Sequence, residues 1–211
     1  MSAREDILGR IRTALKDNPE APQIPREYRE TSDLDEAALI ELLVDRLIDY
    51  KAQVSVVDAG EVPARIAELL ADAQSYVVPA GIDAGWIAVL GHERGDSRRH
   101  ADSAAAPLTV AELDGIDAVL TGSAVAVAET GTIILDGSPN QGRRAISLVP
   151  DHHICIVKAA DITGILPEAL RRIDGTRPLT MISGPSATSD IELERVEGVH
   201  GPRRLDVIIA R

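Results

Sequence analysis

The sequence predicts an α/β fold: a mainly parallel sheet flanked by helices, with an N-terminal helical arm. Three observations carry this prediction. Strand-like apolar segments alternate with segments of helical periodicity from residue 35 to the end. Hydrophobic residues make up 45% of the 211 residues, which is enough for one sizeable core. The segment Ile154–Val157 is apolar at every position, as is typical of a strand that is covered on both faces.

An amphipathic helix over Ala3–Leu15 is the first predicted element, because its apolar residues fall on one helical stripe. Asp17–Ser32 contains three prolines and few apolar residues, which is typical of a linker. We therefore divide the chain into an N-terminal helix and linker, 1–34, and an α/β domain, 35–211. The arm could pack on a partner subunit or on its own domain, and we favour its own domain.

The front half of the domain alternates helices and strands. We expect helices at Asp35–Tyr50 and Val62–Ala73, and strands at Gln53–Val57, Ser75–Pro79 and Trp86–Leu90. The polar segment His92–Pro107 is interpreted as a surface loop. A lid or an anion clamp formed by its three arginines (Arg94, Arg98 and Arg99) is the alternative.

The back half continues the alternation in shorter pieces. The expected elements are a short helix or turn at Val110–Leu113, apolar segments at Ala118–Leu120, Ser123–Ala128 and Gly131–Leu135, a turn-rich loop at Asp136–Arg144, strands at Ile146–Val149, Ile154–Val157, Leu179–Ile182 and Leu205–Ala210, and a helix at Ile162–Ile173.

Composition excludes several classes of function. Aromatic residues are 2% of the chain and the net charge is −12, which argues against nucleic-acid binding by base stacking or by phosphate contacts. The acidic excess lies in residues 1–136, so the nearly neutral remainder would repel an anionic substrate less. A single cysteine can form no internal disulfide and cannot by itself hold an iron–sulfur cluster. Any such cluster would have to sit on another protein.

Several standard motifs are missing from the sequence. It contains no G-x-G-x-x-G after a strand, no P-loop and no G-x-S-x-G. His152, His153 and Cys155 lie close together, but no companion ligands accompany them, so we expect a structural role and no metal site. The longest uncharged apolar stretch, Ala118–Ala128, is too short to span a membrane, and the N-terminus has no signal-peptide pattern. We expect a cytoplasmic protein without membrane association.

Small residues surround one carboxylate in the middle of the chain. Glu129 interrupts a long apolar region, and burying a charge is costly unless it is paired or hydrogen-bonded. It is therefore the candidate catalytic residue, as nucleophile or general base, or else a substrate anchor. A carboxylate on a solvent-facing hairpin turn is the structural alternative, and the residue pattern does not separate the two.

Two C-terminal segments add hydroxyls, backbone N–H groups and a histidine. The run Ser183–Asp190 follows a predicted strand, and α/β sheets bind ligands beyond such strand ends. His200, between two glycines and a proline, could move a proton near neutral pH. A turn with an N-cap and a histidine that satisfies backbone groups are the alternatives. The candidate substrate-binding residues are Gly122, Ser123, Thr130, Gly131, Thr132, Ser183, Gly184, Pro185, Ser186, Asp190, His200 and Gly201.

The last two segments, S-G-P-S-x-x-x-D-I-E at 183–192 and G-V-H-G-P at 198–202, resemble the lactate utilisation protein C family, the stand-alone LUD domain. The segments A-E-T-G-T at 128–132 and L-V-P-D-H-H-I at 148–154 are similar to it as well. The resemblance covers roughly residue 117 to the end. It implies a fold of the NagB/RpiA/CoA-transferase-like group and a role, within a set of three proteins, in oxidising L-lactate to pyruvate. The other members of that set would carry the iron–sulfur clusters.

Three hypotheses follow. In the first, the protein is a component of an iron–sulfur-dependent L-lactate oxidation system and binds a small carboxylate, another small anion or a partner protein in its C-terminal half. In the second, it is an acyl- or CoA-transferase-like enzyme; transferases of this fold group use a glutamate nucleophile, and Glu129 is the only candidate. In the third, it is a non-catalytic assembly or regulatory subunit that acts through its N-terminal arm.

Overall fold

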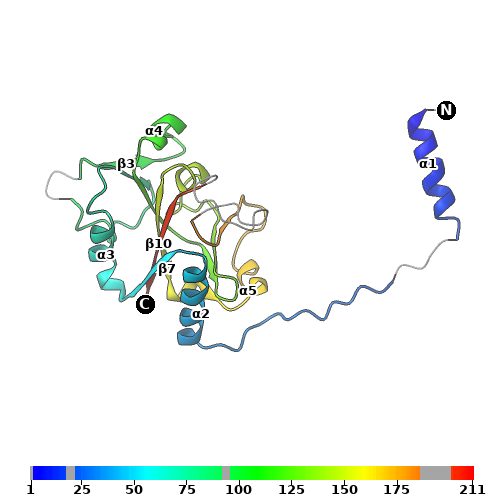
Figure 1. Cartoon of the computed structure of the whole chain (residues 1–211), viewed down its shortest axis with the longest axis horizontal. Helices are drawn as coiled ribbons and strands as arrows, with labels where there is room; N and C mark the ends of the chain where they lie inside the picture. The colour runs from blue at the N-terminus through cyan, green and yellow to red at the C-terminus, as the bar shows by residue number, and fades with distance from the viewer. Residues whose placement is uncertain (1, 18–21, 92–95, 186–200) are drawn as a thin grey trace.

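The computed structural model describes residues 2–17, 22–91, 96–185 and 201–211, and it contains two sheets (Figure 1). The larger sheet has six strands, all paired in parallel. Their spatial order is β1 (Gln53–Val57), β10 (Arg204–Ala210), β7 (His152–Lys158), β4 (Ala118–Gly122), β2 (Tyr76–Pro79) and β3 (Arg99–Asp102). The predicted α/β fold with a mainly parallel sheet flanked by helices is confirmed.

A smaller four-stranded sheet covers part of the larger one. Its order is β8 (Ile162–Thr163), β5 (Val125–Val127), β6 (Thr132–Leu135) and β9 (Thr180–Ile182). β6 pairs antiparallel with both β5 and β9, whereas β8 and β5 are parallel. The apolar segments in the middle of the chain therefore form a sheet of their own, which the sequence did not predict.

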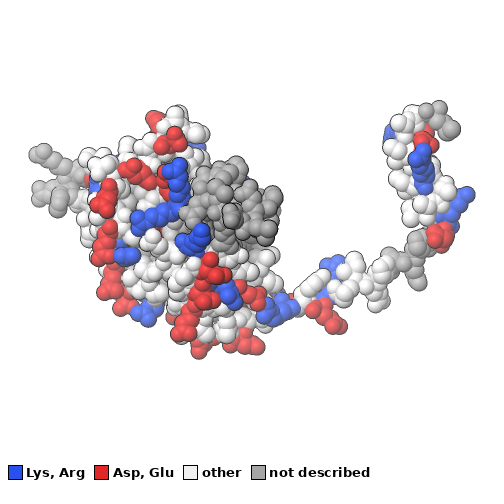
Figure 2. Space-filling view, in the orientation of Figure 1, with Lys and Arg blue, Asp and Glu red and all other residues white. Residues whose placement is uncertain are grey.

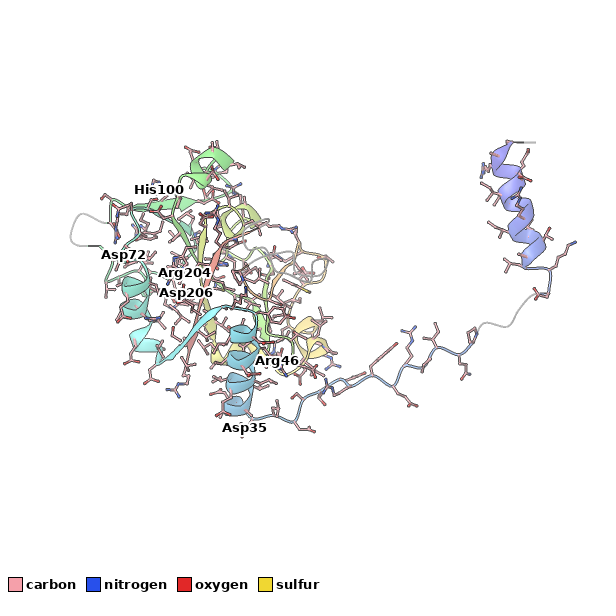
Figure 3. The ribbon with its side chains drawn as sticks, viewed as in Figure 1. Asp35, Arg46, Asp72, His100, Arg204 and Asp206 are labelled. Carbon is pink, nitrogen blue, oxygen red and sulfur yellow. The ribbon has the colours of Figure 1, made fainter. Side chains whose placement is uncertain are left out.

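Five α-helices lie among the described residues. They are α1 (Ala3–Ala14), α2 (Glu36–Asp49), α3 (Val62–Leu69), α4 (Val110–Asp114) and α5 (Leu166–Leu170). α2 begins at Asp35, whose side chain accepts a hydrogen bond from the Ala38 amide at 2.9 Å (Figure 3). It buries Leu43 and Leu47 completely. None of the described helices has the length and hydropathy that crossing a bilayer requires.

The alternation of side chains along the central strands separates two layers of core. Ile154 and Ile156 of β7 belong to the cluster that packs with α3. Cys155 and Val157, on the opposite face, pack with α2 and the smaller sheet. Because both faces are covered, β7 is buried from His153 to Val157, as its uninterrupted apolar sequence predicted.

Four local predictions are wrong. Trp86–Leu90 is a series of turns, and Ile146–Val149 overlaps a 3-10 helix, Arg144–Ser147. The segment Ile162–Ile173 begins with β8, because Ile162 and Thr163 pair with β5, and only Leu166–Leu170 is helical. Within His92–Pro107, residues 99–102 form the edge strand β3. In each case a short apolar run fits several local structures, and pairing with distant segments decides between them.

The N-terminal arm is helical as predicted, but it does not pack on its own domain. α1 lies away from the α/β body in Figure 1, and none of its residues is buried. Ile7, Ile11 and Leu15 are each about half exposed, so the apolar stripe of the helix is open. Ser2 and Glu5 form a capping box that closes its first turn.

Candidate functional site

Six of the predicted substrate-binding residues line one cavity of about 480 Å³, which we call the hydroxyl cavity. These are Thr130, Thr132, Ser183, Gly184, Pro185 and Gly201. They come together because β6 and β9 pair antiparallel, which places the beginning of β6 beside the residues that follow β9. The structure therefore joins the middle of the chain to part of its C-terminal segments.

Three of the hydroxyl groups that line this cavity form a hydrogen-bonded chain. Thr130 Oγ1 and Thr132 Oγ1 are 2.8 Å apart, and Thr132 Oγ1 and Ser183 Oγ are also 2.8 Å apart. A hydroxyl can donate one hydrogen bond and accept two, so the chain has remaining capacity for a ligand oxygen. It is an array suited to a small molecule that carries hydroxyl, carbonyl or carboxylate oxygens.

Gly184 places the backbone of this wall where no side chain would fit. Its φ is +125°, and a Cβ atom there would come within 2.7 Å of the Tyr50 carbonyl oxygen. Glycine is the residue that adopts such a conformation at low cost. The turn after β9 therefore lies directly against the end of α2, beside the hydroxyl chain.

His153, at the beginning of β7, also lines the hydroxyl cavity. It is 1% exposed, and its Nε2 lies 2.8 Å from Thr121 Oγ1. Burial, with a smaller contribution from the charge of His152, lowers the pKa of His153 to about 3, so the ring is neutral at physiological pH. Its other ring nitrogen has no hydrogen-bond partner among the described residues.

Arg144 supplies the positive charge of the cavity. Its side chain is exposed and lines the hydroxyl cavity. Within the described ranges it makes no hydrogen bond or ion pair. Most other arginines of the domain differ in this respect: Arg143 is paired with Asp102, for example, and Arg177 with Asp136. An unpaired guanidinium beside hydroxyl groups is suited to binding a carboxylate.

The structure separates Glu129 from these residues. Its carboxylate is ion-paired with Arg29 of the N-terminal linker, and it lines a different hollow of about 280 Å³. Its side chain is 44% exposed. Glu129 thus lies on an accessible turn between β5 and β6 and does not line the hydroxyl cavity.

Three other predicted residues serve the packing of the fold. Gly122 lies under the loop after β6, where a Cβ atom would meet the Asn140 side chain at 2.4 Å. Ser123 Oγ donates to the Ile156 carbonyl at 3.1 Å. Gly131 has φ +61° and packs on Arg46 of α2. Ser186, Asp190 and His200 lie outside the described residues.

Sequence reasoning missed Arg144 and interpreted His153 as structural. His153 and Cys155 do share a face, and both contact Thr121, as their spacing indicated. Burial raises the pKa of the Cys155 thiol to about 12. The described residues contain no group of three or more histidine, cysteine or acidic side chains that could hold a metal ion. What the sequence could not show is that β7 also brings His153 to a cavity wall.

The face of the molecule that Figure 2 presents has an uneven charge. Figure 2 shows Asp and Glu side chains along the edges of the face it presents, with several Lys and Arg side chains gathered nearer its centre. The chain as a whole carries a net charge of −12.

Comparisons with known proteins give a consistent result. The family model described as the LUD domain matches residues 40–210. The chain is 45% identical to a "Lactate utilization protein C" of Deinococcus radiodurans, over 98% of this chain and 95% of that protein. It is 36% identical to a protein of the same name from Shouchella clausii, over 44% of this chain and 43% of that one. A crystal structure of a DUF162 family protein from Deinococcus radiodurans superimposes with a TM-score of 0.71 at 43% identity, covering 84% of this chain and 99% of that one.

Proposed function

The chain belongs to the LUD domain family, and on this premise we propose that it is a component of a lactate utilisation system that oxidises L-lactate to pyruvate. Relatives that carry the name lactate utilization protein C support the role in lactate utilisation. In this proposal the hydroxyl cavity binds the small carboxylate, lactate or pyruvate.

The observation that carries the proposal is the combination of Arg144 with the hydroxyl chain in one cavity. Lactate has two polar groups on adjacent carbons, a carboxylate and a hydroxyl. Arg144 matches the carboxylate, because guanidinium and carboxylate form charge-assisted hydrogen bonds. The Thr132 and Ser183 hydroxyls, with neutral His153, match the 2-hydroxyl of lactate or the keto oxygen of pyruvate.

The electron transfer itself is assigned to partner proteins. Lactate loses two electrons and two protons when it becomes pyruvate, and we propose that iron–sulfur clusters on the partners accept the electrons. The role of this chain is then to hold or deliver the carboxylate, and the two protons pass to the partner proteins or to solvent. Because the pKa of His153 is about 3, the free imidazole is a weak base and orients the oxygen better than it abstracts a proton.

Titration calorimetry with lactate, pyruvate and propionate tests the proposal. We expect lactate and pyruvate to bind, and propionate, which lacks the second oxygen, to bind more weakly. Arg144→Gln is expected to weaken lactate binding about tenfold, as the loss of one charge-assisted hydrogen bond implies. Thr132→Val should weaken it by a smaller factor. Arg99→Gln is the matched control, because Arg99 is also exposed but does not line the cavity.

Two outcomes would count against this function. If neither acid binds, or if Arg144→Gln binds lactate as the parent protein does, the cavity assignment is wrong. A reconstituted system that oxidises lactate equally well without this protein would remove the role in the pathway as well.

The geometry favours carboxylate binding over acyl transfer by Glu129. A nucleophile must reach the bound substrate, and Glu129 lines a hollow apart from the hydroxyl cavity. We therefore expect Glu129→Gln to retain lactate binding and lactate-dependent activity. Trapping an acyl-glutamyl intermediate at Glu129 would reverse this preference.

A further inference from the structure

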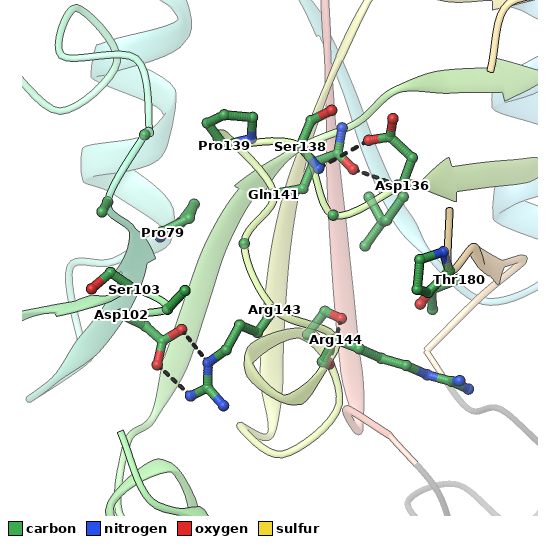
Figure 4. A pocket seen from close by; sticks show the side chains of 18 of the residues that line it. Pro79, Asp102, Ser103, Asp136, Ser138, Pro139, Gln141, Arg143, Arg144 and Thr180 are labelled. Atoms are coloured by element: carbon green, nitrogen blue, oxygen red, sulfur yellow. Dashed lines mark hydrogen bonds and ion pairs between the residues drawn. The ribbon is translucent and has the colours of Figure 1, made fainter. Parts of the chain in front are cut away.

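A second and larger cavity, of about 610 Å³, lies where β2 and β3 end (Figure 4). We call it the strand-end cavity. Residues 79–81 and 102–104 line it on one side, and residues 135–139 and 141–144 line it on the other. The Gly122 amide at the end of β4 donates to the Asn140 carbonyl, so the same loop covers the end of β4.

This position is next to a topological switch point of the sheet, which lies between β2 and β4. From β2 the chain proceeds to β3 on one side and then returns to β4 on the other side of β2. The connections beyond β2 and β4 therefore diverge, and open α/β sheets bind ligands in the crevice that such divergence leaves. The cavity volume is within the range of sites for small organic ligands, about 300 to 1,000 Å³.

The charges in the strand-end cavity leave one positive charge unpaired. Arg143 donates two hydrogen bonds to Asp102, which is buried, and Arg177 donates to Asp136 at 2.9 Å. Each of these cations is thus neutralised by a carboxylate. Arg144 also lines this cavity, and its side chain extends away from Asp102 toward the Thr180 side in Figure 4. It has no polar partner among the described residues. A ligand with one negative charge would complete the balance.

The remaining walls are largely aliphatic. Pro79, Leu135, Pro139 and Pro178 line the cavity, and none of its lining residues is aromatic. A planar base would find no ring to stack on. An aliphatic chain, by contrast, can bury its surface against proline and leucine.

The cavity is held open by close contacts of its own walls. A Cβ atom on Gly81 would come within 2.7 Å of the Pro139 backbone, so the loop after β6 rests directly on the end of β2. Gly142 has φ +72° and approaches Pro79 in the same way. With Arg143 fixed to Asp102, these contacts place both walls before any ligand arrives. A preorganised site loses less entropy on binding.

We propose that the strand-end cavity binds an aliphatic monocarboxylate larger than lactate, with its carboxylate at Arg144 and its chain along Pro79, Leu135 and Pro139. Octanoate is a suitable probe. The neutral amide of the same chain, octanamide, is its control for charge. Arg144 lines both cavities, so lactate and octanoate should compete for its charge, while the other contacts of each ligand lie in different cavities.

Titration calorimetry with the full-length protein tests the proposal. We expect octanoate to bind and octanamide to bind about tenfold more weakly, as the loss of one charge-assisted interaction implies. Ala104→Glu adds a negative charge to the cavity wall and should weaken octanoate binding about tenfold. Ala106→Glu is the matched control: Ala106 is equally exposed and two residues away but does not line the cavity, so binding should stay within about twofold.

The proposal is overturned if octanoate does not bind, if octanamide binds equally well, or if Ala104→Glu has no more effect than Ala106→Glu. Thr132→Val separates the two cavities, since Thr132 lines only the hydroxyl cavity. It should weaken lactate and leave octanoate unchanged. If the parent protein binds octanoate but does not bind lactate, the proposed function alone is contradicted.

Discussion

His153 combines a polar residue type with nearly complete burial, and this has a consequence for stability. Its pKa is about 3 in the folded protein and near 6.5 in an unfolded chain. Between these values the unfolded chain binds a proton that the folded protein does not. The free energy of unfolding must therefore fall as the pH is lowered through this window.

We expect acidification from pH 7.5 to 5.5 to cost about 1.4 kcal/mol through His153 alone. Urea unfolding of the parent protein and of His153→Gln at both pH values measures this term. The loss of free energy of unfolding between pH 7.5 and pH 5.5 should be smaller in the variant by about 1.4 kcal/mol. If the free energy of unfolding depends on pH equally in the two proteins, His153 binds the proton in the folded state as readily as in the unfolded state.

Arg144 shows why individual site residues are hard to predict from sequence. It follows Arg143, and nothing in the local pattern distinguishes the two. Arg143 is neutralised by Asp102, 41 residues earlier in the chain, and Arg177 by Asp136, also 41 residues earlier. Which arginine remains unpaired thus depends on long-range contacts that only the fold provides. The hydroxyl residues were predictable because glycine and hydroxyl residues cluster visibly after a strand.

At the scale of elements, local patterns predicted α2, β1, β7, β9 and β10 correctly, but they did not predict that β5, β6, β8 and β9 form a separate sheet. α2 has a long apolar stripe and an N-cap, and β7 is apolar throughout. β5, β6 and β9 have only three or four residues each. In such short segments the apolar period does not determine the pairing partner. The pairing of these strands depends instead on their packing against α2 and β7 in one core cluster.

The turn between β5 and β6 depends on one glycine. Gly131 has φ +61°, and a Cβ atom there would lie 2.7 Å from Arg46 Cβ. We expect Gly131→Ala to lower the free energy of unfolding by about 2 kcal/mol, because a left-handed backbone costs alanine about 1 to 2 kcal/mol and the overlap adds to it. Gly60→Ala is the control, since no atom lies within 4 Å of its Cβ position and its φ is not positive. Equal midpoints of chemical unfolding for the two variants would contradict this account of the turn.

For the whole molecule, α1 adds a separate element that contributes nothing to the core. None of its residues is buried, and its apolar stripe is open. Deleting residues 1–16 is therefore expected to change the thermal midpoint by less than about 2 °C, which for a protein of this size corresponds to less than about 1 kcal/mol. Differential scanning calorimetry measures it. A clear drop in the thermal midpoint would show that the helix packs on the α/β body.

The same deletion tests whether the arm acts in assembly. If α1 joins this chain to another copy or to a partner, the shortened protein should elute as a smaller species or lose partners in a pull-down, with lactate binding unchanged. Retention of both oligomer size and partners would remove the assembly role of the arm.

The single cysteine of the chain lies at the centre of the larger sheet, covered on both sides and with its thiol protonated. A thiol-labelling reagent needs the thiolate and free access to the sulfur, so it can react only when this layer of the protein opens. The rate of Cys155 modification, followed by mass spectrometry, thus reports how often this layer of the protein opens. Lactate or octanoate, if bound to the folded form, should lower the rate of Cys155 modification, and more so the more each ligand stabilises the protein.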